Sequence, residues 1–201
     1  MAAPISHIVL AQKIYKNHFS NLNSTDFFIG TLFPDIRYLG CINRNETHYL
    51  NVDLLALKKE TAFEAGLKFH SYIDLTRQKF LDDKKLSSYC PKIKYLEQSI
   101  KFYEDILFYD YVMNWQLYIN NLNEVNLNEL KFNINKDTIL KWHQSLQNYF
   151  NEKPNKDSIK NFIISIGFSE EVSNEIVANI KILNKIDEIK PILNLLYENF
   201  S

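Results

Sequence analysis

Apolar residues recur every three or four positions along nearly the whole chain, which is the spacing of one face of an α-helix. Glycine and proline are scarce, at four and five residues, and no Asn-Gly or Asp-Gly pair marks a β-hairpin turn. The pattern predicts an all-α protein built as a bundle of many helices. At 201 residues the chain has the length of a single domain, which we place at residues 1–201.

The amino-terminal part contains two well-marked helices. The first is predicted from about Ile5 to His18, with Pro4 near its start, where a missing N–H costs little. The second begins near Ser24, in a run of good N-cap residues. It ends before Pro34, because the residue preceding a proline disfavours the helical conformation.

The rest of the chain is predicted as helices separated by less patterned segments. Residues 37–46 are predicted as a loop, and residues 51–81 as helical with a break near Thr61. Residues 114–135 are rich in asparagine and weakly patterned. Further helices are expected at 92–112, opened by Pro91, and at about 136–151, 156–166, 170–184 and 187–199.

Composition narrows the class of protein. The chain is 46% hydrophobic and 14% aromatic, which is enough to build a sizeable core. Its net charge of −1 leaves no basic surface of the kind that binds nucleic acid, so no stable nucleic-acid complex is expected. The two cysteines, Cys41 and Cys90, lie far apart and outside any CxxC motif, which argues against a disulfide framework or a thiolate zinc site.

The sequence shows no targeting signal. A basic segment followed by a long apolar one is missing at the amino terminus, and no run of about 18 apolar residues could form a transmembrane segment. A cytoplasmic location is therefore expected, with export by a signal-independent route left open.

His70 and Asp74 stand four residues apart in the segment GLKFHSYID, which has a helical pattern. Side chains at i and i+4 project from the same helix face, so this imidazole and carboxylate can share one metal ion or one hydrogen bond. Gly66 lies one turn earlier on that face and leaves room for another backbone to come close. Such a pair alone is weak evidence for a metal site, since a lone histidine in a helix more often has its hydrogen bonds satisfied by the protein than binds a metal.

Three more motifs precede this helix, and their order is more specific than any one of them. They are Ser6-His7, the segment from Gly30 to Asp35 with proline before the aspartate, and Thr47-His48. Together with GxxxHxxxD, the set resembles the zinc-dependent phospholipase C family, which includes the amino-terminal domain of glycosylphosphatidylinositol-specific phospholipase D and is related to the S1/P1 nucleases. The likeness covers roughly residues 5–80, and residues 81–201 form a helical remainder.

The resemblance implies an all-helical domain of the phospholipase C/P1 nuclease type that binds one to three zinc ions, or another divalent metal. Asp35 would bridge two metals in that arrangement. The alternative is that Asp35 only forms a turn and binds no metal. Glu104 or Asp105 could complete a second site, with a solvated acidic face as the alternative. The residues that match the family's ligands are His7, Asp35, His48, His70 and Asp74.

These ligands predict a metal-dependent phosphoesterase, a phospholipase C-like hydrolase that acts on a small phosphate ester or phospholipid head group through a metal-activated water. Asp35 is the candidate general base. The three arginines, Arg37, Arg44 and Arg77, are candidates to hold the phosphoryl group, with plain surface solvation as the alternative. Two other functions stay open: a non-catalytic helical scaffold that binds metal and a partner, and a nuclease or nucleotidase on the same scaffold.

Overall fold

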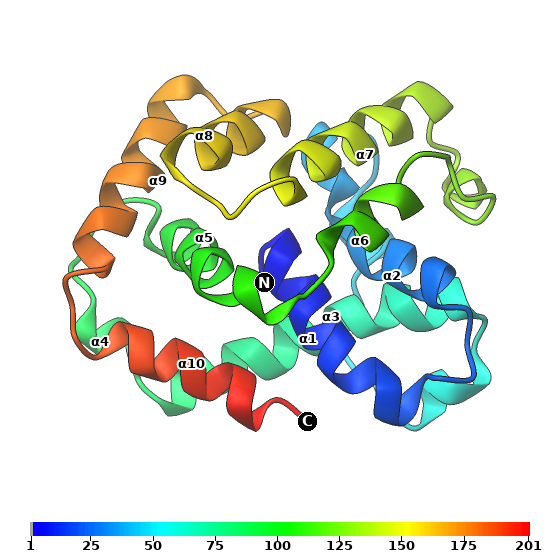
Figure 1. Cartoon of the computed structure of the whole chain (residues 1–201), viewed down its shortest axis with the longest axis horizontal. Coiled ribbons are helices and arrows are strands. Elements are labelled where there is room, and N and C mark those ends of the chain that lie inside the picture. Colours follow the sequence, from blue (N-terminus) through cyan, green and yellow to red (C-terminus); the bar gives the residue numbers. More distant parts are fainter. Residues whose placement is uncertain (1) are drawn as a thin grey trace.

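Helices make up the regular structure of the chain. The computed structural model describes residues 2–201, and over that range it contains no β-strand (Figure 1). The all-α prediction is therefore confirmed, and the helices pack as one domain. The α-helices are α1 (Pro4–His18), α2 (Ser24–Leu32), α3 (Ala62–Asp83), α4 (Leu86–Tyr89), α5 (Leu96–Phe108), α6 (Trp115–Asn121), α7 (Lys136–Phe150), α8 (Lys156–Ser165), α9 (Glu170–Leu183) and α10 (Ile189–Asn199). Short 3-10 helices join them: η1 (Phe33–Leu39), η2 (Arg44–Glu46), η3 (Ala56–Lys59), η4 (Tyr109–Tyr111) and η5 (Glu129–Phe132).

Capping side chains explain why the predicted helix starts are close to the observed ones. Asn135, Asn155 and Ser169 each precede a helix and accept a backbone N–H of its first turn. As a result α7 to α9 lie within about one residue of their predicted bounds, and α10, which has no side-chain cap, begins two residues later than predicted. The predicted break near Thr61 is also confirmed, because Thr61 is the N-cap of α3 and accepts from the N–H of Glu64.

Four predicted segments differ from the structure. Residues 51–61, expected as helical, contain only η3 before α3 begins. The expected loop at residues 37–46 is wrong in part, since η1 continues to Leu39 and η2 occupies Arg44–Glu46. The helix expected directly after Pro91 begins only at Leu96, because Tyr95 has a left-handed backbone with φ of 56°. The weakly patterned stretch at 114–135 contains α6 and η5.

Two glycines let α2 and α3 cross at backbone contact. A Cβ on Gly66 would lie 2.0 Å from the carbonyl oxygen of Phe27, and one on Gly30 would lie 2.2 Å from that of Phe63. No real side chain fits such a space, so the expectation that Gly66 admits a second backbone is confirmed. The crossing fixes the amino-terminal half of α3 against α2.

The amino-terminal end of α1 is enclosed by other helices. Figure 1 shows it in the middle of the molecule, with α5 on one side and α2 and α3 on the other. The α8–α9 pair packs beside α5 and α7, and α10 lies against α3. The first turn of α1 is therefore buried, and it opens onto the space between α3, α5 and η1.

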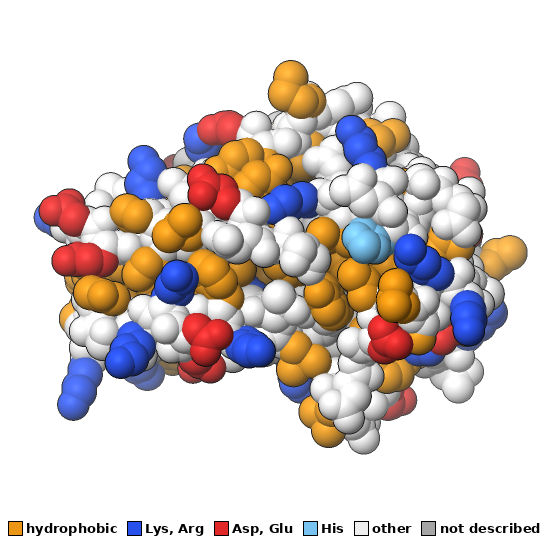
Figure 2. All heavy atoms as spheres, turned by 90° about the horizontal axis from the view of Figure 1, so that it is seen from below, with side chains coloured by type: hydrophobic (Ala, Val, Ile, Leu, Met, Phe, Trp, Pro, Cys, Tyr) orange, Lys and Arg blue, Asp and Glu red, His pale blue; other side chains and the backbone are white. Residues whose placement is uncertain are grey.

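The surface carries both signs of charge. Figure 2 shows Lys or Arg and Asp or Glu side chains interspersed with apolar ones over one face, without a large field of a single sign. Within residues 2–201, none of the helices combines the length and apolarity that crossing a membrane requires.

Candidate metal centre

Five side chains from four segments converge beside the first turn of α1. They form two overlapping sets, in each of which one possible ligand atom per residue lies within 4.8 Å of the others. His70 belongs to both sets. The first set is His7, His70 and Asp74, and the second is Asp35, His48 and His70. The structure thus brings together all five residues that the resemblance assigns to metal binding.

The Asp74 carboxylate stands at the middle of the histidines. Its oxygens lie 3.4 Å from Nε2 of His7, 3.7 Å from Nε2 of His70 and 3.9 Å from Nε2 of His48. A tetrahedral zinc ion with ligands at about 2.0–2.2 Å places neighbouring ligand atoms roughly 3.3–3.6 Å apart. The separations in this cluster therefore fit a small divalent ion with little adjustment.

Backbone carbonyls fix the protonation of two of the histidines. Nδ1 of His7 lies 3.1 Å from the carbonyl oxygen of Ala3, and Nδ1 of His70 lies 2.9 Å from that of Thr31. Since a carbonyl oxygen only accepts, each Nδ1 carries the proton and each Nε2 presents a lone pair to the cluster. This hydrogen bond to the far ring nitrogen is the usual support of a metal-binding histidine.

The cluster contains buried polar atoms that the protein itself leaves without hydrogen bonds. Among residues 2–201 these include Nε2 of His7, His48 and His70, and Oδ1 of Asp35, which has only the Arg37 guanidinium at 3.5 Å. Buried polar atoms nearly always have a partner, because leaving them bare costs free energy. Cations held by the two sets would give these atoms partners.

Burial keeps two of the histidines, His48 and His70, neutral. It lowers the pKa of His70 to about 3 and that of His48 to about 4, so both rings are unprotonated at neutral pH. Burial raises the pKa of Asp35, but the neighbouring His70 and His7 outweigh it and the pKa lies below its usual value. Neutral imidazoles together with ionised carboxylates form a donor set that suits zinc.

His70 limits how many ions the histidines can hold. Its Nδ1 donates to Thr31, so only Nε2 is available, and one lone pair serves one ion. An ion in the other set would therefore depend on the two remaining residues of that set, either His7 with Asp74 or His48 with Asp35.

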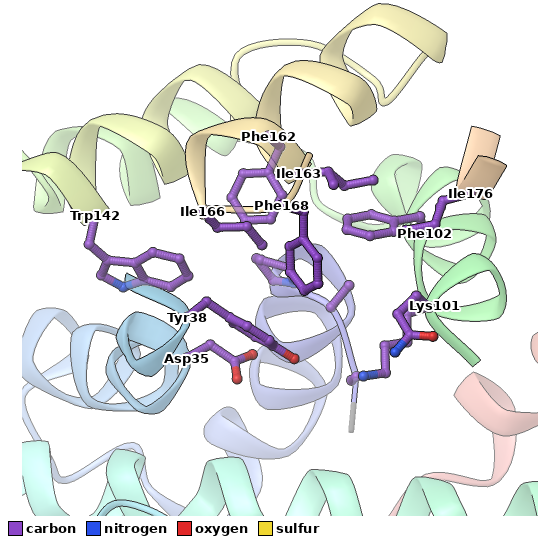
Figure 3. A pocket seen from close by; sticks show the side chains of 14 residues that line it. Asp35, Tyr38, Lys101, Phe102, Trp142, Phe162, Ile163, Ile166, Phe168 and Ile176 are labelled. Atoms are coloured by element: carbon purple, nitrogen blue, oxygen red, sulfur yellow. The ribbon is translucent and has the colours of Figure 1, made fainter. Parts of the chain in front are cut away.

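The cluster is open to small molecules from two sides. On one side lies a groove lined by Arg44, His48, Tyr49 and Asp74, with other residues of the same segments. On the other lies a pocket that reaches Asp35 and is walled mainly by aromatic and aliphatic side chains (Figure 3). We call these the outer groove and the apolar pocket.

Two of the three arginines lie at the cluster. Arg44 lines the outer groove beside His48. Arg37 lies beside Asp35 and stacks on the ring of Tyr38, with its guanidinium carbon 4.2 Å from the ring centroid. Arg77 is instead buried and forms an ion pair with Glu104, with 2.8 Å between Nε and Oε2. Surface solvation is therefore the wrong alternative for Arg77, whose Nε faces a protein carboxylate.

The candidate ligands on α5 belong to neither set of the cluster. Glu104 and Asp105 are both completely buried, so the solvated-face alternative is wrong for them. Asp105 accepts from the backbone N–H and hydroxyl of Ser6, at 2.7 Å each, and from the N–H of Ile5 at 3.3 Å. It thereby caps buried N–H groups that have no acceptor within the helix at the start of α1, which has no side-chain cap of its own. Burial raises its pKa to about 7.

Sequence reasoning missed Lys101, which lines the apolar pocket, as Asp35 does. A signal was present, because Lys101, Glu104 and Asp105 share a helix face and are all buried. Charged residues at that spacing inside an apolar helix would have marked a polar stripe facing the interior. The later histidine, His143, lies outside both sets and pairs with Glu129 at 2.8 Å.

Comparison with known proteins identifies no relative of the chain. The similarity to the zinc-dependent phospholipase C family rests on the motifs from Ser6 to Asp74, so what it implies stays a prediction. No family model, no curated protein and no solved structure matches the chain.

Proposed function

We propose that the protein is a metal-dependent phosphoesterase that hydrolyses a phosphate ester at the cluster. One observation carries the proposal: the Nε2 atoms of His7, His48 and His70 are buried without hydrogen bonds and face the same aspartate, Asp74. That arrangement is costly without a cation and ordinary with one. Zinc is the cation that this mixture of imidazoles and carboxylates favours.

When bound, zinc supplies a Lewis acid that activates water and polarises a phosphoryl group. The residues of the chain supply the rest. His7 and His70 are held by backbone carbonyls and keep their lone pairs directed into the cluster. Asp35 lies in η1, where it can accept a proton from an attacking water, and Arg44 can pair with a phosphoryl oxygen from the outer groove.

Access to the cluster favours a catalytic site over a purely structural one. A structural zinc site is closed by protein ligands on all sides, whereas a catalytic one keeps an open position. Here the outer groove reaches His48 and Asp74, and the apolar pocket reaches Asp35. Both the groove and the pocket therefore have a candidate ligand in their walls, which gives a substrate two routes towards the cluster.

Metal analysis and turnover together test the proposal. Protein purified without a histidine tag or chelator should contain at least one equivalent of zinc, and should hydrolyse members of a phosphoester panel. Asp35→Asn keeps the shape and one ligating oxygen but removes the negative charge and the basicity. It should retain part of the zinc and lose roughly 10²-fold or more in kcat, the usual size of general-base catalysis.

The outcomes separate the three possible functions. Zinc-loaded wild-type protein that turns over no member of the panel would overturn the enzyme proposal and leave a metal-binding scaffold. Activity confined to nucleotides or oligonucleotides would favour the nuclease alternative. Equal turnover by wild type and Asp35→Asn would remove Asp35 from the reaction while leaving the phosphoesterase proposal in place.

A further inference from the structure

The apolar pocket has two chemically different ends. Figure 3 shows Phe162, Ile166 and Phe168 gathered on one side, while Asp35 and Lys101 lie on the opposite side. The space in the pocket that the centre of a water molecule can occupy is about 60 Å³. Its polar end is shared with the metal centre, because Asp35 belongs to both.

Lys101 is the unusual residue of this pocket. It is only 8% exposed, and within residues 2–201 its ammonium makes no hydrogen bond or ion pair. Lysine is almost never buried without a partner, since desolvating the charge is costly. Burial lowers its pKa, although the carboxylates of Asp35 and Asp74 oppose that effect. An ammonium that is held in a pocket without a partner among residues 2–201 is suited to an anionic ligand.

The opposite end of the pocket favours a ring. Phe102 stands edge-on to Phe162 with 6.2 Å between ring centroids, and Tyr38 is tilted against Phe168 at 5.9 Å. Aromatic groups pack favourably at such distances and angles, and a further ring could extend the arrangement. A polyhydroxylated group such as glycerol or a sugar would leave its hydroxyls without partners among these apolar side chains.

We propose that the apolar pocket binds the aromatic group of a phosphate monoester, with Lys101 holding an oxygen of the phosphoryl group beside Asp35. The inference rests on the proposed function, and it assigns to that site the chemical class of its substrate. The phosphoryl group lies at the polar end, next to the metal centre, and the aromatic group of the ester lies between Phe162 and Phe168. Lys101 is a binding residue in this arrangement and takes no proton.

Binding is measured first, so that the test does not depend on turnover. Zinc-loaded protein is titrated with 1-naphthyl phosphate and with glycerol 2-phosphate, two monoesters that differ in the group on the phosphate. We expect 1-naphthyl phosphate to bind at least tenfold more tightly. Lys101→Met keeps the length of the side chain without its charge and should weaken both ligands about tenfold or more. Lys101→Arg should restore part of the loss.

Phe168→Ala is the matched change at the other end of the pocket. It should weaken 1-naphthyl phosphate and leave glycerol 2-phosphate nearly unchanged, since only the aromatic ester reaches that end. Circular dichroism and melting temperature establish that each variant is folded. Equal affinity of wild type for the two esters, or unchanged affinity of folded Lys101→Met, would overturn the inference.

Turnover of the same two esters separates this inference from the proposed function. Selective binding of 1-naphthyl phosphate without hydrolysis of either ester would support the pocket assignment and count against the enzyme. Hydrolysis of both esters with equal kcat/KM would support the enzyme and overturn the pocket assignment. Preferential hydrolysis of 1-naphthyl phosphate would support both if Phe168→Ala loses the preference and Lys101→Met lowers kcat/KM for both esters.

Discussion

At the scale of single residues, the histidines make the metal-free protein sensitive to acid. An unfolded histidine takes up a proton below about pH 6.5, whereas folded His70 does so only near pH 3. Between pH 7 and pH 5 the unfolded state therefore binds more protons, and stability falls as the pH falls. For His70 the loss by pH 5 is about 2 kcal/mol, the equivalent of about 1.5 pKa units.

His70→Asn tests directly whether protonation of His70 lowers stability as the pH falls. Asparagine can still donate to the carbonyl of Thr31 but cannot take up a proton, so this contribution to the acid sensitivity should disappear. We expect the drop in melting temperature of metal-free protein between pH 7 and pH 5 to be smaller in the variant than in wild type. Asp105 changes stability with pH in the opposite direction, because its pKa is raised to about 7. Its contribution is the same in wild type and variant, so the comparison of the two proteins cancels it. An identical drop in both proteins would contradict the lowered pKa of His70.

The residues of the centre differ in how well the sequence predicted them. Five of them could be predicted from the sequence, because their motifs occur in a recognisable order and spacing along the chain. They are His7, Asp35, His48, His70 and Asp74. The roles of Glu104 and Asp105 could not be predicted in this way, because the sequence does not show which buried donors a carboxylate will meet. In the structure Glu104 pairs with Arg77, and Asp105 accepts from the first turn of α1. Lys101 faces a pocket whose walls come from distant parts of the chain.

At the scale of elements, the crossing of α2 and α3 is the feature on which the centre depends. Gly66→Ala would place a methyl group 2.0 Å from the carbonyl oxygen of Phe27. The gain of about 1 kcal/mol in helix propensity is outweighed by overpacking, which typically costs about 1–3 kcal/mol and sometimes more. We expect a net loss of stability, and a loss of zinc as well, because His70 lies one turn further along α3 and donates across the crossing to Thr31.

Gly40→Ala is the control for that substitution. Gly40 has a left-handed backbone, with φ of 72°, but an added Cβ would meet nothing within 4 Å. Its replacement should cost about 1 kcal/mol of backbone strain and leave the zinc content unchanged. Denaturant titration and metal analysis of the two variants check the prediction. A Gly66→Ala protein as stable as wild type and fully loaded with zinc would show that the crossing can relax without moving the centre.

Local signals explain which elements were predictable. Helices with a strong apolar face and a capping Asn or Ser, such as α7 to α9, were placed within about two residues. The start of α5 was misplaced because Pro91 is followed by a turn, in which the N–H of Ile93 bonds to the Pro91 carbonyl. The four-residue helix α4 was missed, since a single turn carries too few positions to show a period.

At the scale of the whole molecule, the metal centre exists only in the folded chain. Its ligands come from α1, η1, the segment after η2, and α3, and its apolar pocket adds side chains from α5, α7, α8 and α9. An unfolded chain cannot bring these segments together, so zinc bound at the centre stabilises the fold by mass action. Zinc at about 1,000 times its dissociation constant would contribute about 4 kcal/mol.

Removing the metal should therefore destabilise the entire protein and not only the site. For a domain of this size a stabilisation of 1 kcal/mol raises the melting temperature by about 2–4 °C, so a chelator should lower it by roughly 8–16 °C. Added zinc should restore the original value. The double variant His70→Ala with Asp74→Ala should melt at one temperature with or without chelator, because it retains too few ligands to hold the ion. If wild type and the double variant respond equally to chelator, the stabilising metal lies elsewhere in the chain. No response from zinc-loaded wild type would mean that the cluster is complete without a cation, and that its bare histidine nitrogens have another physical explanation.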